Sequence, residues 1–108
     1  MEVTIKISNA ALINCFDAGH IDGWGEVKKG ASGKALVTGK GMLKVEEFGD
    51  EDKAIAVHEF RREHIIRGIQ VLAVKHPHLL TSILQDDSDM YTADALIQAG
   101  IFGDVKYG

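Results

Sequence analysis

The chain has 108 residues, of which 45% are hydrophobic and 26% are charged, and its formal net charge is −4. A chain of this length predicts one domain with one buried core, and its acidic balance disfavours general nucleic-acid binding. The first residues lack the basic start and long apolar run of a secretion signal, and no apolar stretch approaches the roughly 20 residues of a membrane span. Cys15 is the only cysteine, so no internal disulfide can form. We therefore expect a protein of the reducing cytoplasm with no membrane contact.

The first part of the chain predicts a strand, a helix and a glycine-rich segment. Apolar and polar residues alternate over residues 2–7, which is typical of a half-buried strand. Ser8 is placed to cap a following helix, and Gly19 is placed to end that helix in a left-handed conformation. Residues 19–41 hold seven of the twelve glycines, which favours turns, bulges or a mobile loop. Trp24 is expected to pack onto the body of the protein and pin that segment.

The middle of the chain predicts an antiparallel hairpin. Residues 42–48 and 54–60 are rich in strand formers, and the glycine and acidic residues at 49–52 between them favour a turn. Four apolar side chains are expected to share one face of this hairpin: Leu43, Val45, Ile55 and Val57.

The last part of the chain predicts helices. Apolar spacing indicates a helix over roughly 62–75, and Pro77 either stops that helix or starts the next turn. A shorter helix is expected around 79–84. Thr92 is placed to cap a further helix. Residues 105–107 are expected to form either a closing strand or an extended tail.

The order of these elements favours an α+β fold, because strands and helices do not alternate strictly. We predict a small antiparallel sheet of three or four strands, with about three helices packed on one face. One domain is expected over residues 1–108, with a flexible glycine- and lysine-rich segment at about 23–41. Self-association is expected through apolar residues near the C-terminus, namely Ile101, Phe102, Val105 and Tyr107.

Residues 93–108 read Ala-Asp-Ala-Leu-Ile-Gln-Ala-Gly-Ile-Phe-Gly-Asp-Val-Lys-Tyr-Gly, residues 68–70 read Gly-Ile-Gln, and residues 39–43 read Gly-Lys-Gly-Met-Leu. Together these segments resemble a family of small uncharacterised proteins encoded by tailed bacteriophages and prophages. Members of that family tend to end in Ala-Asp-x-Ile-Ile-Gln-x-Ala-Leu-Phe-Gly-Glu-Val-Val-Tyr-Gly. At 17–24 the chain departs from the family's Gly-Gly pair and Tyr-Trp, since the pair is broken and glycine replaces the tyrosine. The resemblance implies a phage or prophage origin and the host bacterial cytoplasm, but no assigned activity.

Positive charge is concentrated in the glycine-rich part of the chain. Residues 23–45 carry five lysines and one acidic side chain, whereas the remaining residues carry seven basic and fifteen acidic side chains. Glycine backbone N–H groups and basic side chains favour phosphate, although the spacing of a P-loop is absent. The predicted ligand-binding residues are Trp24, Lys28, Lys29, Lys34, Lys40, Arg61, Arg62 and Arg67. The alternatives are a solvated hairpin tip for the lysines and surface ion pairs with Glu59 and Glu63 for the arginines.

Other reactive side chains have simpler interpretations. The five histidines are His20, His58, His64, His76 and His78, and none has the spacing of a standard zinc motif. We interpret them as surface or capping residues. Cys15 falls on the apolar face of its predicted helix beside Leu12 and Phe16, so a buried structural thiol is favoured over a nucleophile.

These patterns favour a binding protein without catalytic residues or cofactors. The resemblance suggests a phage accessory protein that counters host defence. It would act either by binding a host protein through an acidic surface or by sequestering a small phosphorylated ligand. The alternatives are a metal-dependent hydrolase that uses the histidines and a component of virion assembly.

Overall fold

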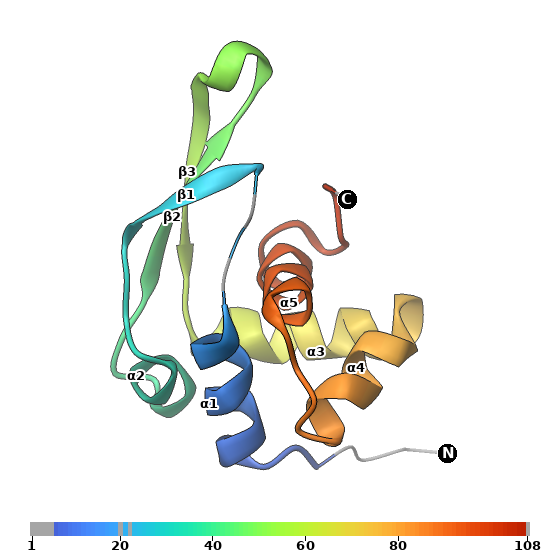
Figure 1. Cartoon of the computed structure of the whole chain (residues 1–108). Helices are drawn as coiled ribbons and strands as arrows, with labels where there is room; N and C mark the ends of the chain where they lie inside the picture. Colours follow the sequence, from blue (N-terminus) through green and yellow to red (C-terminus); the bar gives the residue numbers. More distant parts are fainter. Residues whose placement is uncertain (1–5, 20, 22, 108) are drawn as a thin grey trace.

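The computed structural model describes residues 6–19, 21 and 23–107, and it has the expected α+β class. The three strands found within these residues form one antiparallel sheet in the order β1-β2-β3. The elements of the described chain are α1 (Asn9–Ala18), β1 (Gly25–Lys29), α2 (Gly33–Thr38), β2 (Leu43–Phe48), the 3-10 helix η1 (Asp50–Asp52), β3 (Ala54–Phe60), α3 (Arg62–Lys75), α4 (Pro77–Leu84) and α5 (Met90–Phe102). In Figure 1, α1, α3, α4 and α5 lie together on one side of the sheet, and the β2–β3 tip extends beyond them.

The predicted hairpin is confirmed, but the face assigned to its second strand was wrong. In the β2–β3 ladder Leu43 lies opposite Phe60 and Val45 lies opposite His58, so these four side chains share the core-facing side. Val57 is therefore on the other face, where it is 55% exposed, and Ile55 is 60% exposed. The error came from the register, because pairing Leu43 with Phe60 turns the even-numbered residues of β3 inward.

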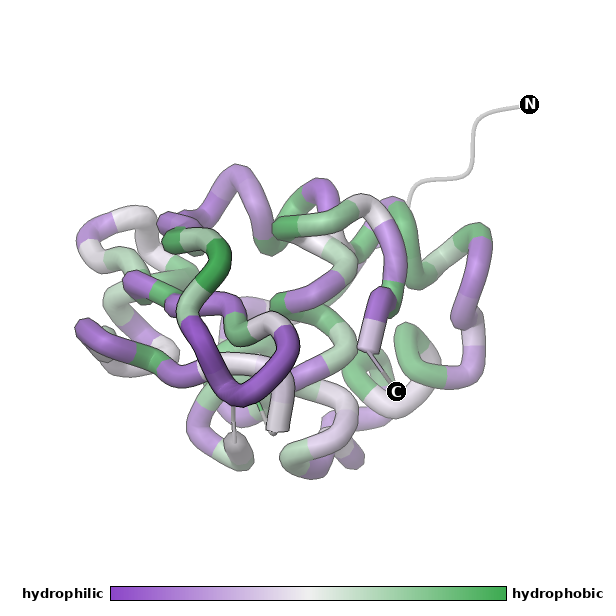
Figure 2. Tube along the Cα trace, turned by 90° about the horizontal axis from the view of Figure 1, so that it is seen from above, coloured by the Kyte–Doolittle hydropathy of each residue, from purple (hydrophilic) through white to green (hydrophobic). Residues whose placement is uncertain are grey.

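Figure 2 looks down on the molecule from above and shows hydrophilic and hydrophobic segments alternating along the chain. Ile55 and Val57 of β3 are two of the large hydrophobic side chains that are exposed.

The glycine-rich segment forms regular structure that the sequence did not predict. It contains β1, which pairs with β2, and α2. The Ser32 hydroxyl caps α2 by accepting a hydrogen bond from the Ala35 backbone N–H at 3.1 Å, and Gly39 ends the helix with φ of 80°. Leu36 and Val37 of α2 are buried in the core. Burial of this apolar pair, rather than helix propensity, stabilises so short a helix. Flexibility of the segment remains a prediction.

Two of the predicted helix ends need correction. Ser8 caps α1 as expected, since its hydroxyl accepts from Ala11 N at 3.1 Å. Gly19 is not left-handed: its φ of 163° is extended backbone. Helix α5 begins before Thr92, because the Asp89 carboxylate is the cap and accepts from Thr92 N at 2.9 Å. The Thr92 hydroxyl completes this capping box from within the helix.

The boundaries around α3 and α4 follow the sequence closely, whereas the predicted first strand is not confirmed. Helix α3 spans the predicted residues 62–75, and Pro77 is the first residue of α4. Residues 105–107 form an extended tail, not a strand. Of the strand predicted at 2–7, residues 2–5 lie outside the described residues, and Lys6 and Ile7 are not in a strand.

Helix α5 is the centre of the fold. Every residue from Thr92 to Gly100 is buried, because the helix contacts α1, α3, α4 and β3. It approaches α3 closely at two glycines, Gly68 of α3 and Gly100 of α5. Because the helix is enclosed on all sides, its apolar residues do not gather on one face, and the buried polar side chains Thr92, Asp94 and Gln98 lie among them.

The C-terminal apolar residues are partly buried. Ile101, Phe102, Val105 and Tyr107 pack against the core. Self-association through these residues remains a prediction. Within the described ranges, no helix combines the length and apolar character that crossing a bilayer requires.

Candidate functional site

A small cavity lies where β1, α2 and the start of α3 meet. Its volume is about 260 Å³, and its lining residues are Lys29, Gly30, Ala31, Gly39, Lys40, Gly41, Met42 and Arg61. We call it the cationic cavity, because the charged residues among these are two lysines and an arginine. The structure thus brings together Lys29, Lys40 and Arg61 from the set predicted to bind a ligand.

Local structure explains why these three side chains converge. Lys29 is the last residue of β1 and lies opposite Lys44 in the ladder with β2. Lys40 follows the left-handed Gly39, and its backbone N–H donates to the Ala35 carbonyl at 2.9 Å, which closes the turn after α2. Arg61 lies between β3 and α3 as the N-cap residue of α3. Three segments that are distant in sequence therefore present their cations to one cavity.

The charges of the cationic cavity are largely available to a ligand. Arg61 Nη2 lies 3.0 Å from Glu59 Oε2, but both side chains are about half exposed, so this ion pair is weak. Among the described residues that line the cavity, none is acidic. Lysines supply point charges, the arginine supplies a planar fork, and glycines allow the backbone to approach a ligand closely. This combination suits a doubly charged anion such as a phosphate group.

The other lysines of the predicted set lie elsewhere. Lys28 is on the outer face of the sheet, where its Nζ lies 3.0 Å from Glu26 Oε2 and 3.8 Å from Glu46 Oε1. The pKa of Lys28 is raised, mainly by its hydrogen bond to Glu26. The negative charges of Glu26 and Glu46 raise it further. Lys34 is exposed on α2 and does not line the cationic cavity. Lys28 and Lys34 therefore lie outside the cationic cavity, to which β1 contributes Lys29.

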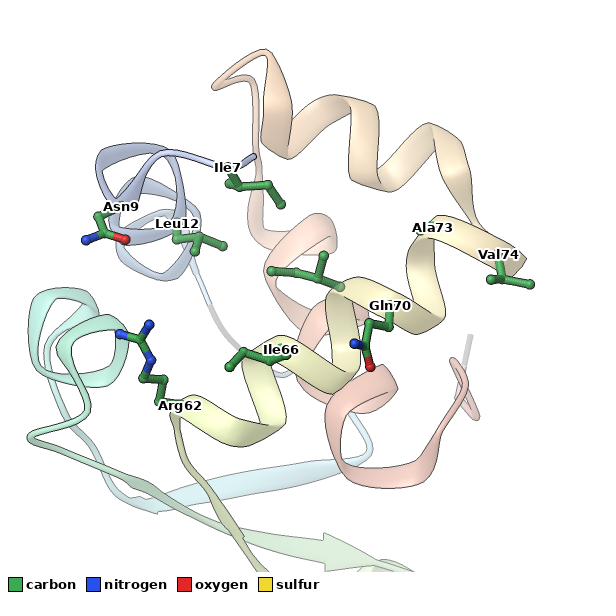
Figure 3. Close-up of a pocket in the computed structure, with 9 residues that line it drawn as sticks. Ile7, Asn9, Leu12, Arg62, Ile66, Gln70, Ala73 and Val74 are labelled. Carbon is green, nitrogen blue, oxygen red and sulfur yellow. The ribbon is translucent and has the colours of Figure 1, made fainter. Parts of the chain in front are cut away.

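The other arginines are also outside the cationic cavity. Arg62 Nη1 donates a hydrogen bond to the Val37 carbonyl at 2.7 Å, which ties α3 to α2. Arg62 also lines a larger groove of about 630 Å³ between α1 and α3 (Figure 3). That groove is mostly apolar, with side chains such as Leu12, Ile66 and Val74, so one arginine does not make it a phosphate site. Arg67 lies beside Gly103, just after α5.

Trp24 has a structural role, as the pinning hypothesis predicted. It is only 4% exposed, and its Nε1–H donates to Asp94 Oδ1 at 2.7 Å. Its ring stacks on Tyr107 at 5.5 Å with an interplanar angle of 4° and meets the edge of Phe102 at 5.5 Å. Trp24 is therefore not among the lining residues of the cationic cavity.

The histidines are engaged in separate local contacts. His58 Nε2 lies 2.9 Å from Glu47 Oε1, His76 Nε2 lies 3.0 Å from Asp104 Oδ1, and His64 Nδ1 accepts from the Arg61 backbone N–H at 2.9 Å. His20 lies outside the described residues. Within the part of the chain that the structure covers, no group of three or more histidine, cysteine or acidic residues could hold a metal ion.

Cys15 is a fully buried thiol, and burial is the main cause that raises its pKa. Because the thiolate is the reactive form, we expect iodoacetamide to alkylate the folded protein far more slowly than the urea-unfolded protein. Mass spectrometry over a time course measures both rates. Equal rates would contradict the buried position of the thiol.

Sequence reasoning missed a buried polar cluster around Glu47. This residue is 3% exposed, and it accepts hydrogen bonds from the Tyr107 hydroxyl and from Lys106 Nζ, the latter at 3.1 Å. Burial alone works to raise the pKa of the carboxyl, but hydrogen bonds from Tyr107, His58 and Lys106 outweigh it and lower the pKa to about 2. A signal was available, since Leu43 and Val45 point inward and alternation then places Glu47 on the same side.

Comparison with known proteins finds no matching family model, no matching curated protein and no matching solved structure.

Proposed function

We propose that this protein is a binding protein that sequesters a small phosphorylated ligand in the cationic cavity. The observation that carries the proposal is the convergence of Lys29, Lys40 and Arg61 on one cavity lined by three glycines. Lys29 and Lys40 both come from the lysine-rich residues 23–45, and the fold adds Arg61 from the start of α3. Charge-assisted hydrogen bonds from such groups are the strong kind that hold phosphate.

The size of the cationic cavity limits the ligand. At about 260 Å³ it is smaller than the roughly 300–1,000 Å³ of most small-molecule sites. It therefore suits a phosphate group with a small adjoining part, such as a sugar, better than a whole dinucleotide. Sequestration needs no catalytic residue, which agrees with the binding role favoured by the sequence.

The phage resemblance supplies a setting for this activity. We propose that the protein is a phage or prophage accessory protein that acts in the host cytoplasm, where removing a phosphorylated signal would blunt a host defence. Binding of a host protein through acidic surface is the second candidate. It is favoured by three exposed acidic residues at the hairpin tip, Asp50, Glu51 and Asp52.

Isothermal titration calorimetry against inorganic phosphate, sugar phosphates, nucleoside monophosphates and cyclic nucleotides tests the proposed ligand. We expect at least one of these compounds to bind with one site per chain. The Lys29→Glu/Lys40→Glu variant should bind it at least tenfold more weakly, because each lost charged hydrogen bond is worth about 1.5–3 kcal/mol. Raising the salt concentration should also weaken binding.

Lys34→Glu is the matched control, because it changes an exposed lysine of the same segment outside the cationic cavity. It should retain binding within about twofold. A null result across the whole panel, or equal losses in the control and the double variant, would rule out the cationic cavity as a phosphate site.

A further inference from the structure

A second cavity, of about 550 Å³, has the opposite charge. It lies between four segments: the residues before β1, the β2–β3 turn, the first turns of α5 and the C-terminal tail. Figure 1 shows the hairpin tip and the C-terminal tail rising above the helices on the same side of the molecule. The lining residues that matter to its chemistry are Trp24, Asp50, Asp52, Tyr91, Asp94 and Tyr107.

The charged residues of this cavity are all acidic. Asp50 and Asp52 come from the hairpin tip and Asp94 from α5, and the described part of the chain contributes no lysine, arginine or histidine to the lining. The Asp94 carboxylate is positioned by hydrogen bonds to its Oδ1 from Trp24 Nε1 at 2.7 Å and from Gln98 Nε2 at 3.2 Å. A concave surface lined by one sign of charge concentrates ions of the other sign. The cavity therefore selects against phosphates and for cations.

Aromatic rings form the remaining walls. The Trp24 and Tyr107 rings stack in parallel, and the ring of Tyr91 is 57% exposed. Ammonium groups are attracted to aromatic faces, and the methylenes beside them bury apolar area there.

The arrangement favours an organic cation over a metal ion. Hard metal ions require several oxygen ligands that converge on one point. Over the described ranges, no three acidic, histidine or cysteine side chains lie close enough together to hold a metal ion. The three aspartates that line the cavity therefore do not converge on one point. Separated carboxylates joined by aromatic walls match a chain of methylenes that carries ammonium groups at intervals. We propose that this cavity binds a linear polyamine.

Calorimetric titration of the full chain with spermidine tests this proposal. One binding site is expected, weakened at least fivefold by Asp50→Asn or Asp52→Asn and severalfold by Tyr91→Ala. All three side chains are exposed, so the variants should fold like the wild type, and circular dichroism checks this. Asparagine also tolerates the left-handed φ of 55° at Asp52.

Glu63→Gln is the matched control, because it removes one exposed negative charge at the opposite end of β3 from the hairpin tip. It should leave spermidine binding unchanged, as should Lys29→Glu/Lys40→Glu in the cationic cavity. Absence of binding, or equal weakening by Glu63→Gln, would overturn the proposal. Mg²⁺ binding that displaces spermidine and is abolished by Asp52→Asn would overturn it in favour of a metal site.

Discussion

Replacing Gly100 by alanine is expected to lower the free energy of unfolding by about 2–3 kcal/mol, as overpacked cores do. In an exposed position of an ordinary helix, replacing glycine by alanine raises the free energy of unfolding by roughly 1 kcal/mol. At Gly100 we expect the opposite change. A Cβ atom added at Gly100 would overlap the backbone carbonyl oxygen of His64 and lie 2.8 Å from Cε2 of Phe60. Because the first obstacle is the backbone of α3, relief requires α3 and α5 to separate.

Urea unfolding followed by circular dichroism measures this effect. Gly30→Ala is the matched control, since an added Cβ there meets nothing within 4 Å and its φ is not in the left-handed region. The control should stay within about 0.5 kcal/mol of the wild type. A Gly100→Ala variant as stable as the wild type would show that the two helices are not as close as the structure places them.

Neutralising Glu47 is expected to remove a large acid-dependent part of the stability. The folded-state pKa of about 2 lies below the ordinary value of 4.5, a difference worth on the order of 3 kcal/mol. A carboxyl with a depressed pKa contributes stability that is fully present above its ordinary, unfolded-state pKa of 4.5. That contribution is lost as the pH falls towards the folded-state pKa of about 2, where the folded protein must also bind the proton.

The measurement is urea unfolding of the wild type and of Glu47→Gln from neutral pH down to roughly pH 2.5. At neutral pH the variant should be less stable by about 2–3 kcal/mol, and the gap should shrink steadily once the pH falls below the ordinary carboxyl pKa. Glu46→Gln is the neighbouring control, because Glu46 lies on the outer face of the sheet. Its one ion pair with Lys28 is long, at 3.8 Å between Nζ and Oε1. A gap that stays constant with pH would show that the Glu47→Gln substitution disturbs packing rather than charge.

Local signals in the sequence were enough for the elements whose stabilising contacts are also local. Helix α3 was predicted to the residue, and Ser8 caps α1 as its hydroxyl predicted. Helix α2 could not be predicted in the same way, because it has six residues and is stabilised by burying Leu36 and Val37 against distant segments. The inward face of β3 was mispredicted because register depends on the partner strand and not on β3 alone.

The candidate sites also combine features that local sequence predicts with features that depend on distant segments. The charge excess of residues 23–45 identified Lys29 and Lys40, but it could not separate them from Lys28 and Lys34, whose directions depend on the strand and the helix. Among the arginines, Arg61 lines the cationic cavity because α3 begins only at the next residue. The second cavity, with its acidic lining, had no sequence signal, because Trp24 and Asp94, which both line it, are 70 positions apart in the chain.

The long-range partners of Trp24 and Glu47 also bear on how quickly the native state is reached. The Trp24–Asp94 and Glu47–Tyr107 hydrogen bonds join positions 70 and 60 residues apart. Helices form within about a microsecond, whereas contacts of such separation wait for large chain loops to close. The rate-limiting event should therefore be the docking of α5 and the tail onto the sheet. Refolding should accordingly be slower than that of a simple helical bundle of similar length.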